Sequence, residues 1–150
     1  MNIQLRKIEQ RDVTFLWYLR NRPEVYRYFK QAKPVLWEEH IEWVMPYALG
    51  LREGELFVIE MDDILVGQVR LDYEENEGVV SVSILRDFWG KGIASQAIER
   101  LCEISKNESR AFLIRAEIHE DNEASVGLFT RCGFVEVDSQ GNQRQFIFKI

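Results

Sequence analysis

The sequence of 150 residues has few cysteines, no long apolar run and no excess of basic residues. Its longest apolar runs span only a few residues, such as 111–114, whereas a helix that crosses a bilayer needs about 20. Residues 1–10 contain no apolar segment typical of a secretion signal. The net charge of −6 argues against nucleic acid or anionic membrane as partners, because both are bound through basic surfaces. We therefore expect a cytoplasmic protein that binds neither.

The two cysteines, Cys102 and Cys132, form no CxxC pair and belong to no Cys/His cluster. The sequence therefore predicts no metal site and fits a reducing compartment. Cys132 is a poor candidate nucleophile, since no histidine lies beside it in the sequence. A mildly acidic protein favours a cationic substrate such as an amine, although a local pocket can still hold an anionic cofactor.

The hydrophobic content of 46% and charged content of 29% are those of an ordinary globular protein, and no Pro/Gly/Ser linker divides the chain. We expect one domain over residues 1–150. Apolar periodicity predicts an α/β (α+β) sandwich with a β-meander in its middle. The expected helices lie at 11–21, 36–47, from 93 onward and at 122–131, and the expected strands at 5–8, 56–60, 64–73, 79–85, 112–118, 134–137 and 146–150.

A glycine-containing loop joins the strand at 79–85 to the next helix. Gly90 and Gly92 allow the backbone to approach a ligand closely, and the free amides at the start of a helix form an anion site that suits phosphate. Lys91 adds a positive charge. The spacing is neither that of a Walker loop nor that of a dinucleotide-binding loop. Taken alone, such a loop is also compatible with a simple turn.

A second segment, 119–134, predicts a short helix capped by Asp121 or Asn122, packed through its apolar residues and ended at Gly133. Together with the glycine loop it resembles the GCN5-related N-acetyltransferase (GNAT) superfamily. The acetyl-CoA signature Gln/Arg-x-x-Gly-x-Gly/Ala falls on residues 89–94. The second signature falls on Asn122, Ser125, Leu128, Phe129, Gly133 and Phe134, with one helix and one strand between the two.

This resemblance implies a mixed, mostly antiparallel sheet of six or seven strands flanked by about four helices. It also implies acetyl-CoA as co-substrate, with its pyrophosphate on the amides of residues 90–95 and its pantetheine arm near Asn122 and Ser125. A backbone amide where the strand ends at Ile84 and Leu85 would polarise the thioester. The full set expected to contact acetyl-CoA is Ile84, Leu85, Trp89, Gly90, Lys91, Gly92, Ile93, Ala94, Ser95, Asn122, Ser125 and Phe129.

Three residues depart from the family pattern. Trp89 replaces the Gln or Arg that donates to the pyrophosphate, and Phe129 replaces a tyrosine that protonates the leaving thiolate. Val79 stands where many relatives carry the glutamate that serves as general base. We therefore expect Glu77, on the same strand face, to take the amine's proton. The alternatives are Glu117 and His119, and a solvated turn position remains the competing explanation for Glu77.

The N-terminal third resembles the branch of the superfamily that acetylates nucleotide-linked amino sugars of the pseudaminic-acid type. The shared patterns are W-x-x-R-N-x-P-x-V at residues 17–25 and E-H-x-x-W at 39–43. By this resemblance Arg20, Asn21 and His40 bind the acceptor. Capping or surface roles are the alternative for these three residues, and core packing is the alternative for the tryptophans.

The leading hypothesis is an N-acetyltransferase acting directly on the primary amine of a small molecule, most specifically a nucleotide-linked amino sugar. A ribosomal-protein N-terminal or polyamine acetyltransferase is the alternative within the fold, and the acidic net charge favours it. A non-catalytic acyl-CoA-binding regulator is the alternative of another class. Dimers are common in the superfamily, so a homodimer is also possible.

Overall fold

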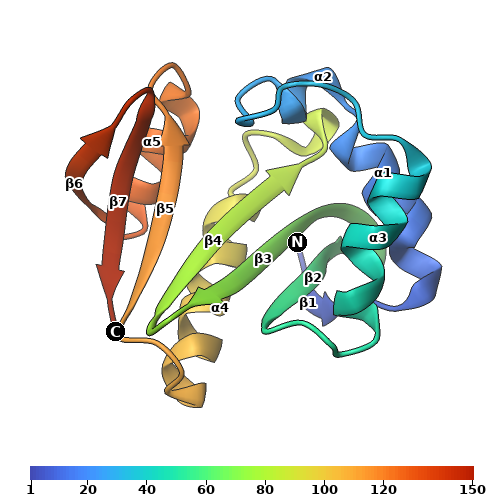
Figure 1. Cartoon of the computed structure of the whole chain (residues 1–150), viewed down its shortest axis with the longest axis horizontal. Coiled ribbons are helices and arrows are strands. Elements are labelled where there is room, and N and C mark those ends of the chain that lie inside the picture. Colours follow the sequence, from blue (N-terminus) through green and yellow to red (C-terminus); the bar gives the residue numbers. More distant parts are fainter.

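The computed structural model describes residues 1–150, with the exception of the Gln140 side chain. Its centre is a seven-stranded sheet in the order β1-β2-β3-β4-β5-β7-β6 (Figure 1). Every neighbouring pair is antiparallel except β4 and β5, which are parallel. The strands are β1 (Ile3–Lys7), β2 (Gly54–Met61), β3 (Ile64–Glu74), β4 (Glu77–Ile84), β5 (Leu113–His119), β6 (Val135–Gln140) and β7 (Gln143–Lys149).

Five α-helices flank the sheet, and the predicted mixed α/β architecture is confirmed. They are α1 (Val13–Arg20), α2 (Pro23–Tyr26), α3 (Trp37–Ala48), α4 (Ile93–Glu108) and α5 (Glu123–Arg131), with 3-10 turns at Gln10–Asp12 and Arg86–Phe88. None of the described helices combines the length and apolar character needed to span a membrane.

Two local predictions differ from the structure. The helix expected at 11–21 is α1, which ends at Arg20, and a further short helix, α2, begins at Pro23, because a first-turn position needs no backbone N–H from its residue. Residues 74–78 lie between the strands expected at 64–73 and 79–85. Instead β3 continues to Glu74 and β4 begins at Glu77, and the tight turn between them places Glu75 at a φ of 56°. Glu77 is therefore the first residue of β4, with a side chain that is 37% exposed.

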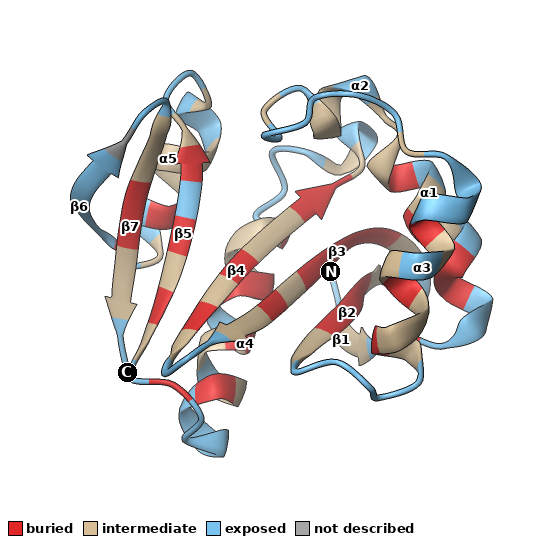
Figure 2. Ribbon diagram, in the orientation of Figure 1, coloured by how far each residue is buried: buried red, intermediate tan, exposed pale blue. Residues whose placement is uncertain are grey.

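The two faces of the sheet carry different side chains. Along β5, Ile114, Ala116 and Ile118 are buried in the apolar cluster shared with α4 and α5. The alternating residues Arg115 and Glu117 are less buried and face the opposite side, as strand geometry requires (Figure 2). A second apolar cluster packs α1 and α3 over β2. The face that carries Arg115 and Glu117 is thus only partly covered, and we call it the open face.

A buried carboxylate fixes the N-terminal segment to the first strand. Asp12 is 1% exposed and accepts hydrogen bonds from Arg6 Nη1 at 2.9 Å, Arg6 Nη2 at 2.8 Å and the Glu9 amide at 2.8 Å. Burial raises the pKa of Asp12, but the Arg6 guanidinium and the amide outweigh that effect and lower the pKa below its usual value. The folded protein therefore favours the ionised form.

We expect D12N to lower the free energy of unfolding by about 2 kcal/mol at pH 7, because it leaves buried donors poorly paired. A depressed folded pKa stabilises the protein above the unfolded pKa, and that contribution is lost as the pH falls through the folded pKa. The difference between wild type and D12N should therefore shrink as the pH falls below about 3.9, the ordinary aspartate pKa, and toward the lowered folded pKa. Chemical denaturation at pH 7 and again below the ordinary aspartate pKa measures the difference in unfolding free energy between wild type and D12N. D63N, at an exposed turn residue, is the control, and an equal loss for D12N at both pH values would contradict the assignment.

Candidate functional site

The parallel strands β4 and β5 pair over only a short length and then diverge. Their pairing covers Glu77 with Leu113, Gly78 with Ile114, and Val79 with Arg115. Beyond Val79 the two strands separate, as Figure 1 shows between the labels β4 and β5. The second half of β4 therefore has a strand neighbour on its β3 side only, and we call the space beside it the opening.

Backbone groups of β4 point into this opening. The Leu85 amide donates to Val66 O at 2.8 Å, so in the antiparallel ladder Leu85 and Ser83 direct their backbone groups toward β3. Ile84 and Val82 alternate with them and direct their backbone groups away from β3. Of the two residues predicted to polarise a thioester, Ile84 therefore offers a free amide, whereas the Leu85 amide is already bonded to β3.

The glycine loop follows at the end of β4. Gly90 and Gly92 have φ values of 76° and 75°, and a Cβ added at either residue would meet nothing within 4 Å. Gly92 is the N-cap of α4 and no side chain caps this end, so the first amides of the helix are available to an anion. Both glycines leave open space in front of this backbone, as the predicted pyrophosphate site requires.

Trp89 takes a different role from the residue it replaces. Its indole Nε1 donates to Ile84 O at 2.8 Å, which ties the glycine loop to the end of β4. The ring remains 51% exposed, and Lys91 beside it is exposed as well. The loop thus presents backbone amides and a mobile cation to solvent, and uses the tryptophan to hold its own position.

The second motif lies against the first. Cys132, at the end of α5, places its Sγ 3.9 Å from Ser95 O in the first turn of α4. Asn122 caps α5 by accepting from the Ser125 amide at 3.2 Å, so the predicted capping role is confirmed. Phe129 is only 4% exposed and packs edge-on against Phe134. Its ring belongs to the core, which does not fit the predicted contact with acetyl-CoA.

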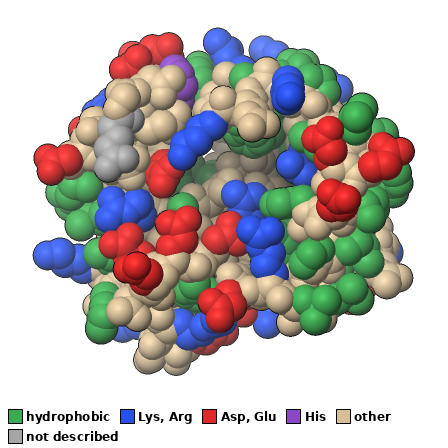
Figure 3. Space-filling model, viewed as in Figure 1, with side chains coloured by type: hydrophobic (Ala, Val, Ile, Leu, Met, Phe, Trp, Pro, Cys, Tyr) green, Lys and Arg blue, Asp and Glu red, His purple; other side chains and the backbone are tan. Residues whose placement is uncertain are grey.

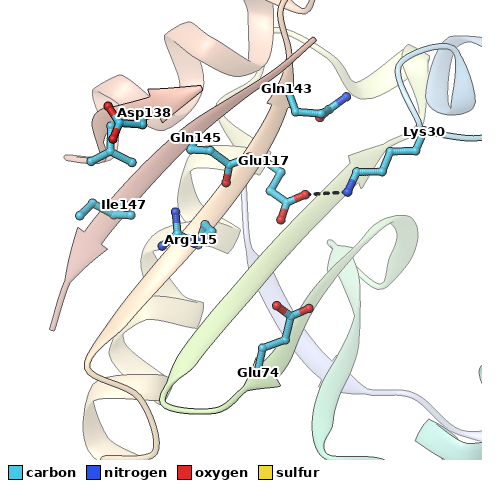
Figure 4. A pocket seen from close by; sticks show the side chains of 9 residues that line it. Lys30, Glu74, Arg115, Glu117, Asp138, Gln143, Gln145 and Ile147 are labelled. Atoms are coloured by element: carbon cyan, nitrogen blue, oxygen red, sulfur yellow. Dashed lines mark ion pairs between the residues drawn. The ribbon is translucent and has the colours of Figure 1, made fainter. Parts of the chain in front are cut away.

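The candidate bases lie on the open face. Glu77 accepts from Arg115 Nε at 3.0 Å and Nη2 at 3.2 Å, at the point where β4 and β5 are still paired. Glu117 lies two residues beyond the last pair and forms an ion pair with Lys30 at 3.0 Å. Both Arg115 and Glu117 line a cavity of about 590 Å³ with Lys30 and Glu74 (Figure 4).

His119, the third candidate, ends β5. Its Nδ1 accepts from the Asp121 amide at 3.1 Å, its Nε2 lies 3.3 Å from Asn142 Nδ2, and its ring faces Tyr28. Tyr28 and Lys30 both belong to the segment between α2 and α3, so this segment reaches across the opening to β5. His119 is thus held at the edge of the opening by three neighbours.

Two of the three predicted acceptor ligands are committed to the protein itself. Asn21 exchanges two hydrogen bonds with the Val35 backbone, at 2.7 and 3.1 Å. His40 is 0% exposed, with Nε2 2.8 Å from Val13 O and Nδ1 3.1 Å from Arg20 Nη1. A direct contact between His40 and an acceptor does not fit this burial, and only Arg20 is left with unused donors.

Sequence reasoning did not find three charged residues of this face. Lys30 forms an ion pair with Glu117, and Arg115 forms one with Glu77, in each case between elements that are distant in the sequence. Arg70 lies on β3 beside Trp43. The alternation of Arg70 with buried Val69 and Leu71 was the available signal, since it places Arg70 on the open face. Figure 3 shows this face with a hollow near its centre, rimmed by side chains of both charges.

The described residues contain no group of three or more His, Cys, Asp and Glu side chains arranged to hold a metal ion. The prediction that Glu77 acts as a base, and the predicted contacts of the glycine loop with acetyl-CoA, remain predictions.

The Acetyltransferase (GNAT) domain family matches residues 2–135. An uncharacterized protein of Methanocaldococcus jannaschii is 27% identical over 99% of this chain, which spans 31% of that relative's length. A spermidine N(1)-acetyltransferase of Vibrio cholerae is 26% identical over 91% of this chain and 82% of the relative.

Solved structures share the fold. A domain from M. jannaschii superposes with a TM-score of 0.89 at 24% identity, covering 99% of each chain. A V. cholerae spermidine N-acetyltransferase in complex with CoA and spermine superposes with a TM-score of 0.85 at 23% identity, and the match covers 98% of this chain and 95% of that chain. A ribosomal L7/L12 alpha-N-protein acetyltransferase in complex with coenzyme A superposes with a TM-score of 0.88 at 16% identity, and the match covers 100% of this chain and 95% of that chain.

Proposed function

The chain belongs to the GNAT acetyltransferase family, and on this basis we propose that it transfers an acetyl group from acetyl-CoA directly to a primary amine of a small molecule. The observation that carries the proposal is the unpaired half of β4, which the glycine loop connects to an uncapped helix N-terminus. An extended pantetheine chain can add to such a strand edge, while the pyrophosphate binds the helix amides. Asn122 and Ser125 remain the proposed contacts of the pantetheine arm.

The Ile84 amide is the proposed donor to the thioester oxygen, because it points away from β3 into the opening. A backbone donor fixed in a strand needs no reorganisation when negative charge develops on that oxygen. The amine attacks the carbonyl carbon, the bond to sulfur breaks, and the CoA thiolate leaves. Phe129 has no hydroxyl, so the thiolate takes its proton from solvent.

The attacking amine must first lose a proton, and Glu117 is better placed than Glu77 to receive it through a water molecule. Glu77 is held by two guanidinium hydrogen bonds at the closed end of the opening. Glu117 lies farther along β5, beside the cavity, and its one partner is the largely exposed Lys30. We therefore rank Glu117 above Glu77.

Two classes of amine remain as acceptors. The carboxylates Glu74, Glu117 and Asp138 around the cavity and the similarity to a spermidine acetyltransferase favour a polyamine or a peptide N-terminus. The Arg20 position at the end of α1 favours the amino-sugar hypothesis, which rests on sequence pattern alone. A non-catalytic acyl-CoA-binding protein and a homodimer stay as alternatives to be tested.

A thiol-release assay with acetyl-CoA tests the proposal against amino-sugar nucleotides, polyamines and N-terminal peptides. We expect turnover with at least one primary amine, and none with the corresponding tertiary amine. Calorimetry with CoA is run in parallel. Binding of CoA without release of thiol from acetyl-CoA across the panel would contradict the enzyme and favour the binding protein. Absence of CoA binding would contradict both.

A further inference from the structure

A half-buried cation at the end of α1 has no carboxylate partner among the described side chains. Arg20 forms no ion pair there, and its guanidinium lies 4.2 Å from the centre of the Trp43 ring. Its hydrogen-bonding neighbour is His40. Burial lowers the pKa of Arg20, as does the charge of nearby Arg70, and the charge of Glu39 opposes them only in part. An unpaired buried charge is costly, so a protein that keeps one usually has a use for it.

His40 does not neutralise this charge. Its Nε2 lies 2.8 Å from Val13 O, and because a carbonyl oxygen only accepts, Nε2 carries the proton. Nδ1 is then free to accept from Arg20 Nη1. Burial is the main cause that lowers the pKa of His40, so the ring is neutral at pH 7. His40 therefore orients the Arg20 guanidinium without neutralising its positive charge.

A second guanidinium lies on the same tryptophan. Arg70 of β3 is 5.2 Å from the centre of the Trp43 ring, and its side chain is 27% exposed. Its Nε donates to Asp72 Oδ2 at 2.8 Å, while Asp72 Oδ1 accepts from the Tyr47 hydroxyl. Asp72 thus pairs with Arg70 and not with Arg20. The group of Arg20, Arg70 and Asp72 carries a net charge of +1, and the charge of Glu39 acts on Arg20 from outside this group.

The position of this group connects it to the opening. Arg70 is paired in register with Ser81 of β4, so its side chain rises from the open face next to the strand that borders the opening. The α1–α3 layer holds Arg20 and Trp43 on that side, whereas Glu117 and Lys30 lie on the β5 side. The rim of the hollow in Figure 3 accordingly includes basic side chains.

We propose that Arg20 and Arg70, held on Trp43, bind an anionic group of the acceptor, a carboxylate or a phosphate, while its amine reaches the opening. The inference rests on the proposed function and deepens it, since it assigns the acceptor to anionic amines. Two guanidiniums present several planar N–H donors to an oxyanion, which suits both carboxylate and phosphate. A fully cationic polyamine would meet like charge at this point.

Matched amine pairs test the preference and distinguish the two anions. One arm compares glucosamine 6-phosphate with glucosamine, and the other compares γ-aminobutyrate with its amide. We expect kcat/KM to be at least about tenfold higher for the anionic member of one pair. R20Q and R70Q should reduce that ratio to within about twofold of unity. A wild-type preference for the neutral members, or an unchanged ratio in both variants, would overturn the proposal.

R110Q is the matched control, because Arg110 also lies over an aromatic ring, 4.1 Å from the centre of Tyr73, but outside this face. Its selectivity ratio should equal that of the wild type. If Arg20 were only structural, R20Q would lower the melting temperature and slow both members of a pair alike. R20K, which keeps the positive charge, should have a ratio of anionic to neutral kcat/KM between that of R20Q and that of the wild type.

A binding measurement decides the question even without turnover. Inorganic phosphate and succinate are titrated calorimetrically onto the CoA-loaded protein. We expect saturable binding of one of them to the wild type and to R110Q, weakened at least about tenfold in R20Q and R70Q. Equal binding by all four proteins, or by none, would overturn the anion site. Silence in the thiol assay with this binding intact would contradict only the proposed transfer.

Discussion

Replacing Gly92 by alanine is expected to lower kcat/KM for acetyl-CoA about 100-fold, or about 2.7 kcal/mol in transition-state free energy. Gly92 has a φ of 75°, where an L-residue costs about 1–2 kcal/mol. A Cβ there meets no protein atom within 4 Å, so in the free protein it projects into open space. In the complex that is the space in which we place the pyrophosphate, and the methyl group would separate it from the amides of α4. Steady-state thiol release measures the loss of kcat/KM, and CoA calorimetry measures the loss of affinity for CoA.

Gly50 supplies the matched control. It lies two residues after the end of α3 with a φ of 69°, and a Cβ there also meets nothing within 4 Å. G50A therefore introduces the same backbone strain far from the glycine loop. Both variants should lose similar stability, and only G92A should lose affinity for CoA. A G92A enzyme within twofold of wild type would remove the loop from the site. A G50A enzyme as impaired as G92A would show that backbone strain alone explains the loss.

The parts of this site that sequence could predict depend on local rules. Gly90 and Gly92 before an apolar helix, and Asn122 three residues before Ser125, each define a local backbone geometry. The structure has both features where they were expected. The direction of the Leu85 amide is not a local feature. It depends on the strand that pairs with Leu85, because the amide donates to Val66 on β3.

The parts that sequence could not predict depend on distant neighbours. Nothing near Glu77 indicates that Arg115 will bind its carboxylate, because the two residues meet only through the short parallel pairing of β4 and β5. The same applies to His40, whose burial depends on how α1 packs on α3. The E-H-x-x-W pattern identified His40, but it could not distinguish a residue that contacts substrate from one that orients Arg20.

Gly67 has a different constraint, and G67A is expected to lower the free energy of unfolding by about 3 kcal/mol. A Cβ at Gly67 would lie 2.3 Å from Ser83 O and 2.8 Å from Ile84 Cδ1. Ser83 O is a backbone atom in the β3–β4 ladder, so it cannot move without disturbing the neighbouring hydrogen bond from the Leu85 amide to Val66. For a domain of this size the melting temperature should fall by roughly 6–12 °C.

Gly78 of β4 separates this backbone clash from the general effect of adding a methyl group to a strand. A Cβ at Gly78 would lie 2.8 Å from Leu71 Cδ1 and 3.3 Å from Leu71 Cγ, which are side-chain and not backbone atoms, so the buried Leu71 side chain must shift and the strand need not. G78A should therefore cost about 1 kcal/mol. Because Gly67 pairs in register with Ile84, relief of the clash in G67A must also shift the residue whose amide faces the opening. G67A should then lose kcat at temperatures where it is still folded, whereas G78A should not. Equal losses of stability in the two variants would show that the sheet can adjust at Ser83, and that the end of β4 is not held rigidly by its close approach to Gly67.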